Sequence, residues 1–206
     1  MTGLDGAGKS TQVNELAARL RSEGRSVAVS NIWDLVLDPA FAGRSLFEKP
    51  SEADGYLAML EPTARMYFLS HALRESFARA LARGADVLLL NAYWYKYYAT
   101  EVAHGGDPAV LRTITSVLPK PDVTFYLRIS AAEAARRKER FSAYETGFAP
   151  SRSAADFEAF QAVALRELEG LAEELGWNVL SSDLAAAELT ARMGDRLAQV
   201  QSGLAL

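Results

Sequence analysis

The residues of this chain best suited to chemistry form a glycine-rich segment near its amino end. From Gly3 to Ser10 the sequence reads G-L-D-G-A-G-K-S, which satisfies the pattern G-x-x-x-x-G-K-[ST] of a phosphate-binding loop. Glycines let backbone N–H groups turn inward around an anion, and a following helix directs its positive dipole end at the same anion. Lys9 is expected to reach the β- and γ-phosphates, and the Ser10 hydroxyl to ligate Mg²⁺.

The residues expected to contact the phosphates lie in one run of the chain. They are Gly3, Asp5, Gly6, Ala7, Gly8, Lys9, Ser10 and Thr11. The bland alternative is a chance match to the pattern. Against it, Val13, Leu16 and Leu20 follow at helical spacing, so the loop opens a helix as the motif requires.

The elements that would position this loop alternate along the chain. Short apolar strands are predicted over residues 26–30, 87–90, 123–129 and 179–180. Helices are predicted after the loop, over 61–83, from 107 to Pro119, over 130–140, from Ser153 and from Ser182. Alternating strands and helices predict an α/β fold, with a parallel sheet covered by helices on both faces.

Composition narrows the class of protein. At 206 residues the chain is most simply one domain, 1–206, with a substantial core. A net charge of −4 argues against a broad nucleic-acid surface, and the absence of cysteine excludes disulfides, thiolate zinc sites and cysteine nucleophiles. No apolar run approaches the ~18 residues of a membrane span, and no signal peptide is evident. A cytoplasmic enzyme without membrane or nucleic-acid partners is therefore expected.

Several stretches together resemble the thymidylate kinase family of nucleoside monophosphate kinases. They are the run GLDGAGKSTQ, Arg83-Gly84 before an apolar strand, PDVTFYL from Pro121, the basic helix from Ala134 to Arg140, and Tyr144-Glu145 as a shortened lid ending. The resemblance implies the three-layer P-loop sandwich fold, with a lid segment at about 134–152. It also implies ATP and Mg²⁺ as cofactors, a small-molecule nucleotide substrate and a homodimer.

The same resemblance assigns roles to particular residues. Asp5 would accept a hydrogen bond from the sugar of the acceptor nucleotide; a plain loop carboxylate is the alternative. Arg137 and Arg140, with Lys9, would stabilise charge on the transferring phosphoryl group. Arg136 shares a helix face with Arg140, so the inward-facing arginine of the three is left open.

The chain departs from the family before the phosphate loop. The family's first strand lies in mid-sheet, and only Met1 and Thr2 stand in its place here. Its loss would leave unpaired backbone groups on both neighbouring strands. The coherent caps and apolar periodicity of the remaining chain favour a true start further upstream, and a damaged copy is the alternative.

A second departure affects the acceptor site. Asn91-Ala92 stand where the family has Asp-Arg after a strand, so one charge and one phosphate-gripping fork are missing. Lys96 is a candidate replacement, with a solvated lysine as the alternative. The aromatic run from Tyr93 to Tyr98 is either core packing or a base-stacking wall, since ligands of α/β sheets bind at the carboxyl ends of strands.

The long predicted helix shows a third departure. Phe68 is expected to stack on a base, but the family's Asp-Arg pair beside it is absent. Arg74 or His71 are candidate replacements, and each has an ordinary surface or packing role as its alternative.

Two functions of different classes follow. The leading hypothesis is an enzyme that moves the γ-phosphoryl of ATP to a nucleoside monophosphate, with dTMP the best single acceptor by resemblance. The alternative is a catalytically weak, nucleotide-binding regulator, motivated by Asn91-Ala92. A GTPase is disfavoured because no N-K-x-D motif occurs.

Overall fold

The computed structural model describes residues 1–34, 47 and 50–204, and its elements alternate much as the sequence predicts. The strands are β1 (Val27–Ser30), β2 (Val87–Leu90), β3 (Phe125–Arg128) and β4 (Asn178–Ser181). The helices are α1 (Lys9–Ser22), α3 (Pro50–Leu57), α4 (Pro62–Leu81), α5 (Trp94–Ala103), α6 (Pro108–Thr115), α7 (Ala131–Arg136), the short 3₁₀ helix η2 (Tyr144–Thr146), α8 (Ala154–Leu175) and α9 (Ala186–Leu204).

The strands form two separate parallel pairs. β1 pairs with β2, with Val27 opposite Val87, and β3 pairs with β4, with Phe125 opposite Asn178. The predicted parallel pairing is thus confirmed within each pair. One continuous sheet is not present among the described residues, where each sheet has two strands.

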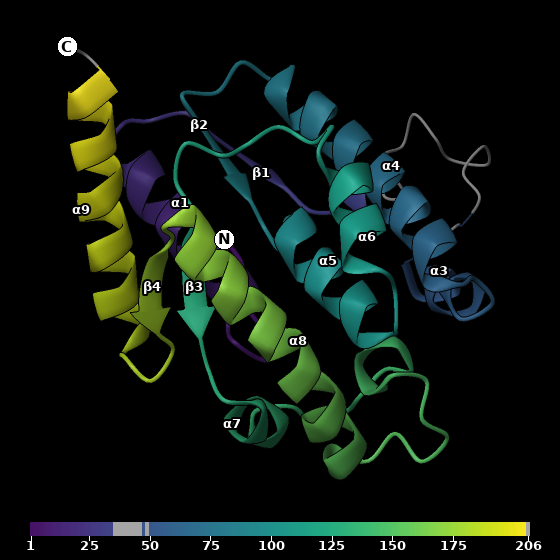
Figure 1. Ribbon diagram of the computed structural model, residues 1–206. Coiled ribbons are helices and arrows are strands. Elements are labelled where there is room, and N and C mark those ends of the chain that lie inside the picture. The colour runs from purple at the N-terminus through teal and green to yellow at the C-terminus, as the bar shows by residue number, and fades with distance from the viewer. Residues whose placement is uncertain (35–46, 48–49, 205–206) are drawn as a thin grey trace.

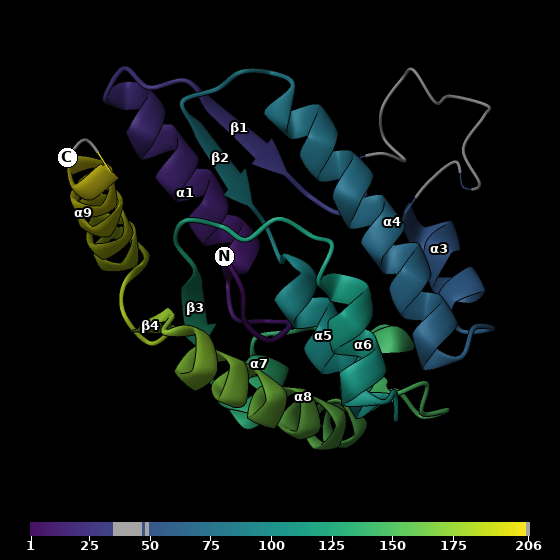
Figure 2. The ribbon, with the colours of Figure 1, turned by 45° about the horizontal axis from the view of Figure 1, so that its top comes forward.

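Met1 and Thr2 are the only described residues that join the two pairs by backbone hydrogen bonds. The Met1 amine donates to the Leu90 carbonyl at 2.7 Å. The Thr2 N–H donates to Phe125 at 2.8 Å, and the Leu127 N–H donates to Thr2 at 3.0 Å. Figures 1 and 2 both place the amino terminus between the two pairs. These two residues therefore occupy the end of a central strand position.

Beyond Met1 this position continues as a cavity of about 400 Å³, which we call the strand slot. Its lining includes Val13, Leu16, Phe77, Leu81, Val87, Leu88, Leu89, Leu90, Lys120, Val123, Phe125, Leu197 and Val200. Successive residues of a parallel strand direct their backbone hydrogen-bonding groups to opposite neighbouring strands. The Asn91 N–H is directed to β1, so the backbone groups of Leu88, three residues earlier, are directed to the slot. The slot lies next to Met1, at the position where the family resemblance places a first strand.

Helices pack on both sides of the β1–β2 pair. Figure 2 shows α1 on one side of this pair and α4 on the other, and α9 lies against α1. Predicted caps are confirmed: Ser130 begins α7, and Ser153 forms a capping box with Asp156 at α8. Within the described residues, no helix has the length and apolarity needed to cross a membrane.

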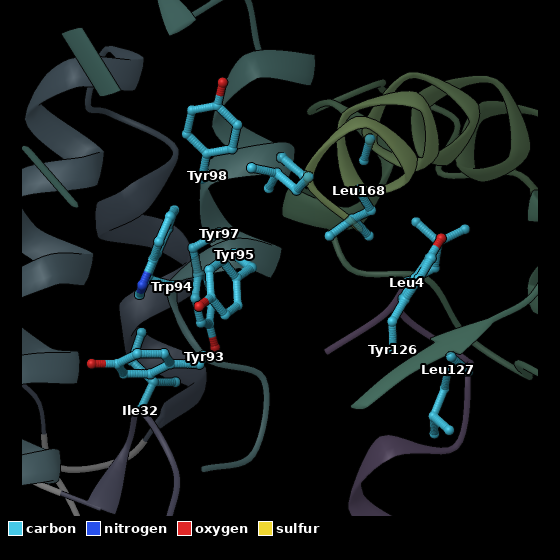
Figure 3. Packing of buried hydrophobic residues seen from close by; sticks show 14 of the residues in the cluster. Leu4, Ile32, Tyr93, Trp94, Tyr95, Tyr97, Tyr98, Tyr126, Leu127 and Leu168 are labelled. Carbon is cyan, nitrogen blue, oxygen red and sulfur yellow. The ribbon is translucent and has the colours of Figure 1, made fainter. Parts of the chain in front are cut away.

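Three predicted boundaries were wrong. The basic helix ends at Arg136, not Arg140, and the last helix begins at Ala186, not at Ser182. The sequence predicts a polar and aromatic connection from Asn31 to about Gly55, but part of that stretch belongs to α3. The aromatic run, to which no element was assigned, folds into α5, where its side chains are buried (Figure 3). The core-packing interpretation of that run is therefore confirmed for most of its rings.

Candidate active site

The phosphate loop has the backbone that its glycines predict. Gly3, Gly6 and Gly8 have φ values of 144°, 86° and 89°, which side chains of L-residues rarely tolerate. A Cβ on Gly3 would stand 2.7 Å from the Leu127 carbonyl oxygen, and one on Gly6 would stand 2.7 Å from that of Ala134. The loop is therefore pressed between β3 and α7, and Gly8 leads directly into α1.

Lys9 is buried in the ligand-free loop. Its Nζ donates to the Leu4 carbonyl at 2.7 Å and lies 3.8 Å from Asp5 Oδ1. Burial is the largest influence on this ammonium, and it lowers the pKa of Lys9 to about 8 despite the attraction of Asp5. An anion bound in the loop would form an ion pair with the Lys9 ammonium and so offset the cost of burying its charge.

Asp5 is held by a second lysine, Lys96, which the sequence had made a candidate. Lys96 Nζ lies 3.0 Å from Asp5 Oδ2 and also packs over the rings of Tyr97 and Tyr144. Burial alone would raise the pKa of Asp5, but Lys96 and Lys9 together lower it to about 2. Burial opposes the charge of Lys96 as well, and Asp5 raises the pKa of Lys96 above its ordinary value. Asp5 is therefore an anion shared between two cations.

Ser10, the expected metal ligand, is linked to the end of β2. Its Oγ accepts a hydrogen bond at 3.1 Å from the Asn91 amide, which also donates to Asn31 Oδ1 at 2.9 Å. No group of three or more His, Cys, Asp or Glu side chains suited to a metal occurs in the described part of the chain. A hydroxyl, an amide oxygen and substrate phosphates nevertheless match the hard oxygen ligands that Mg²⁺ takes.

In the segment predicted as a lid, a lysine lines the site, and the arginines predicted to act there lie elsewhere. Arg137 contacts Glu133 at 3.0 Å and Ser182 and Asp183 at 3.3–3.4 Å. Arg140 is exposed and does not line the pocket. Lys138 lines it, and its Nζ pairs with Glu145 at 2.9 Å.

These side chains surround a second cavity of about 400 Å³, which we call the phosphate pocket. It is lined by Asp5, Gly6, Gly8, Lys9, Ser10, Thr11, Asn31, Ile32, Trp33, Asn91, Ala92, Lys96, Tyr97 and Lys138. Most of the predicted loop residues thus gather with Asn91 and Lys96. No site role was predicted for Asn31, Ile32, Trp33 or Lys138, and only the basic run around Lys138 signalled one of them. Tyr97 belongs to the aromatic run for which a base-stacking wall is one interpretation, and it is the ring of that run that lines the pocket.

Three predicted substrate residues lie outside the lining of this pocket. Phe68 packs against Trp33, with ring centroids 6.5 Å apart, so it is one ring away from the pocket. Arg74 is exposed and lies over the Phe77 ring. Tyr93 is buried, and its hydroxyl has no hydrogen-bond partner in the described structure.

A phosphate loop that opens a helix beside the carboxyl ends of parallel strands defines a nucleotide-binding protein of the P-loop class. No family model matches the chain. The chain is 34% identical to the thymidylate kinase of Chlorobium luteolum over 145 residues, which are 66% of this chain and 64% of that protein. It therefore spans just under two thirds of the length of that relative.

Longer matches point the same way. Identity to the thymidylate kinase of Verminephrobacter eiseniae is 32% over 71% of this chain and 70% of that protein. Identity to that of Mycobacterium tuberculosis is 28% over 93% of this chain and 94% of that protein. The chain belongs to the thymidylate kinase family, whose members are nucleoside monophosphate kinases.

Proposed function

We propose that this protein transfers the γ-phosphoryl group of ATP to dTMP, producing dTDP and ADP with the help of Mg²⁺. The observation that carries the proposal is the phosphate pocket, where Lys9, Lys96 and Lys138 surround one loop of inward-turned backbone. The printed names of the relatives support thymidylate as the acceptor. A phosphate oxygen of dTMP attacks the γ-phosphorus, and the bond to the β–γ bridging oxygen breaks.

Each pocket residue has a role that follows from its position. Lys9 and the loop N–H groups would hold the β- and γ-phosphates, and the Ser10 hydroxyl would ligate the Mg²⁺. The metal neutralises charge on the β- and γ-oxygens when it is bound. No covalent nucleophile is required, because positioning and charge neutralisation carry phosphoryl transfer.

Lys96 takes over the acceptor-phosphate grip that Ala92 lacks. Its Nζ lies within reach of the pocket, and Asp5 keeps it charged. A lysine offers a point charge where the family has a planar fork, so recognition of the acceptor phosphate is less directional. Asp5, held between Lys9 and Lys96, keeps an oxygen for the sugar of the acceptor.

Lys138 is the lid cation that neutralises the transferring phosphoryl group. It lines the phosphate pocket, whereas Arg137 is engaged at the start of the segment after β4. Glu145 holds Lys138 by one carboxylate oxygen and accepts the Ser142 N–H with the other. Arg137 and Arg140 stay predictions for this role.

An aromatic cluster next to the pocket is the proposed base site. Tyr56 and Phe47 lie 5.5 and 5.8 Å from the Phe68 ring, and Trp33 joins this group to the pocket lining. Aromatic faces of this kind stack on a nucleobase. Arg74 and Tyr93, which lie away from the lining, are weaker candidates for substrate contact.

The remaining expectations form part of the same proposal. The chain would be a single domain with its lid at about 134–152, and it would act in the cytoplasm as a homodimer. With a strand in the strand slot, the two parallel pairs would become one sheet in a three-layer P-loop sandwich. No nucleic-acid or membrane partner is proposed, in keeping with the net charge of −4.

The proposal is tested by ADP formation with a panel of nucleoside monophosphates, with calorimetry of ATP and Mg²⁺ as a parallel measurement. We expect dTMP-dependent turnover that exceeds turnover with the other monophosphates. The exchange of Asp-Arg for Asn91-Ala92 favours one second candidate, a nucleotide-binding regulator. Tight ATP binding without turnover on any acceptor would establish that second function and remove the first.

A further inference from the structure

A chain of side-chain hydrogen bonds runs from the phosphate loop to a carboxylate that lies outside the pocket lining. Asn91 Nδ2 donates to Ser10 Oγ at 3.1 Å and to Asn31 Oδ1 at 2.9 Å. Asn31 in turn donates from Nδ2 to Asp34 Oδ1 at 3.1 Å and from its backbone N–H to Oδ2 at 2.8 Å. Asp34 thus ends a relay of four side chains, which begins at Ser10 and passes through Asn91 and Asn31.

The hydrogen bonds that join Asn91, Asn31 and Asp34 are donated in the direction of Asp34, so the Asp34 carboxylate polarises the two amides in the same direction. An amide that donates an N–H to a negative group gains electron density on its own carbonyl oxygen, and successive bonds polarise one another. Asp34 therefore makes Asn31 Oδ1 a better acceptor, and Asn31 does the same for Asn91 Oδ1. Asn91 Oδ1 is buried and has no hydrogen-bond partner in the described structure.

We propose that Asp34 is a positioning residue for Mg²⁺, which supplies through Asn31 the negative charge that Asn91 lacks. The proposal rests on the proposed function, since it concerns the metal that accompanies ATP at Ser10. The residues fit the ion in kind, because a hydroxyl and an amide oxygen are hard ligands and Mg²⁺ keeps waters in its remaining positions. In this structure the Ser10 hydroxyl lines the pocket, and the Asn91 amide holds that hydroxyl through Nδ2, not through its oxygen. Asp34 would act one shell further out: through Asn31 it fixes the Asn91 amide, and that amide fixes the Ser10 hydroxyl that would hold the ion.

The experiment measures metal affinity as well as turnover. Binding of a non-hydrolysable ATP analogue is followed by calorimetry across a Mg²⁺ titration, and Mn²⁺ in the complex is followed by electron paramagnetic resonance. Asp34→Asn should weaken the metal dependence about tenfold, the usual scale for an outer-shell partner, and leave metal-free nucleotide binding unchanged.

A charge-relocation variant separates this role from a structural one. Asn91→Asp returns a carboxylate directly to the site, so Asp34→Asn should have little effect in that background. Asp86→Asn is the matched control, because Asp86 also accepts a backbone N–H, from Ser26 at 2.8 Å, but it lines the strand slot instead. This control should leave the metal dependence unchanged.

The outcomes divide cleanly. A tenfold loss in Asp34→Asn that Asn91→Asp rescues supports the relay, because a folding defect would not be rescued by a charge elsewhere. An unchanged metal dependence, or an equal loss in both backgrounds, overturns the relay and leaves the kinase proposal standing. A parent protein that binds no nucleotide at any Mg²⁺ concentration overturns the proposed function instead.

Discussion

The phosphate pocket and the strand slot are hollows of the same size and opposite chemistry. Each measures about 400 Å³, and Met1 and Thr2 lead from one toward the other. Three lysines and turned backbone line the pocket, whereas the valine and leucines of β2, together with Phe125 of β3, line much of the slot. A charged ligand can enter and leave the first, but only an extended, apolar chain satisfies the walls of the second. Equal volume therefore says nothing about which hollow is a ligand site.

The two hollows are also linked electrostatically. Burial, and then the nearby Lys9 charge, lower the pKa of the Met1 amine to about 5. The same desolvation lowers the pKa of Lys9 to about 8. A positive charge on either amine therefore costs free energy where the slot ends and the loop begins. A phosphate relieves the cost at Lys9, whereas a peptide bond in place of the amine would relieve it at Met1.

The largest expected effect comes from a substitution that disrupts the phosphate pocket and leaves the strand slot intact. Lys9→Met should lower kcat about 10³-fold, the upper scale for loss of one charged donor to a transferring group. Lys120→Met is the matched control, because Lys120 lines the strand slot and should leave kcat unchanged. Steady-state ADP formation with dTMP checks both variants. An active Lys9→Met protein would mean that the loop does not hold the reacting phosphates.

The next largest effect is expected from an added strand that fills the strand slot and leaves the phosphate pocket unchanged. An engineered amino-terminal extension of six Val and Ile residues should form a strand between β2 and β3. Apolar burial of ~1.5–3 kcal/mol per side chain, less an ordering cost of ~1–2 kcal/mol per residue, leaves roughly 3 kcal/mol of added stability. That gain corresponds to a rise in Tm of roughly 10 °C for a domain of this size, measured by calorimetry.

The control for this extension keeps its composition and removes its hydrogen bonding. Proline at the third and fifth added positions deletes backbone donors and disfavours a central strand. This variant should melt at the temperature of the parent chain. If both extensions stabilise the protein equally, simple apolar contact and not strand pairing explains the gain.

The phosphate pocket and the strand slot also differ in how far the sequence could predict them. The phosphate loop was predictable because its conformation depends on its own glycines and on the helix start after Gly8. The slot was predictable only as a consequence of resemblance, since no local pattern reports a missing neighbour. The four strands were located to within a few residues, because apolar runs bounded by turns mark them.

The lid shows why the remaining site residues were missed. The family resemblance made arginines of the predicted helix 130–140 the candidates, but α7 ends at Arg136. Arg137 then takes the cap position, and Lys138 lies beyond the helix, where the chain turns it toward the pocket. That outcome depends on contacts with Glu145 and Ser182, which lie outside the helix and which no periodicity reveals.

A pair of lid variants sharpens the account of the pocket. Lys138→Gln should lower kcat about 10²-fold with little change in the KM for ATP, because its charge acts on the transferring group. Arg137→Gln should change kcat less than about threefold and cost about 0.5 kcal/mol of stability, as expected for partly exposed ion pairs. Kinetics and thermal melts distinguish the two. The reverse pattern would show that the lid turns an arginine inward during the reaction.

The smallest expected effect is a dependence of stability on pH, which compares the Met1 amine with the Lys9 amine. The Met1 amine has its pKa lowered from 8.0 to about 5, and that of Lys9 is lowered from 10.5 to about 8. In each window the unfolded chain binds more protons than the folded one, so the free energy of unfolding should rise with pH. Met1 contributes between pH 5 and 8, and Lys9 contributes between pH 8 and 10.5.

The contribution of the Met1 amine to the pH dependence can be removed while Lys9 stays in place. In the strand-extended protein a peptide N–H replaces the Met1 amine, so the difference in stability between parent and extended chains should shrink as pH rises from 5 to 8. Since Met1 is only half-buried, solvent screening should keep the slope below the ~1.4 kcal/mol per pH unit of one whole proton. Urea unfolding of both proteins at several pH values measures this difference, in which other titrating groups cancel. A difference that stays constant from pH 5 to 8 would mean that the amine reaches water and is not buried at the end of the slot.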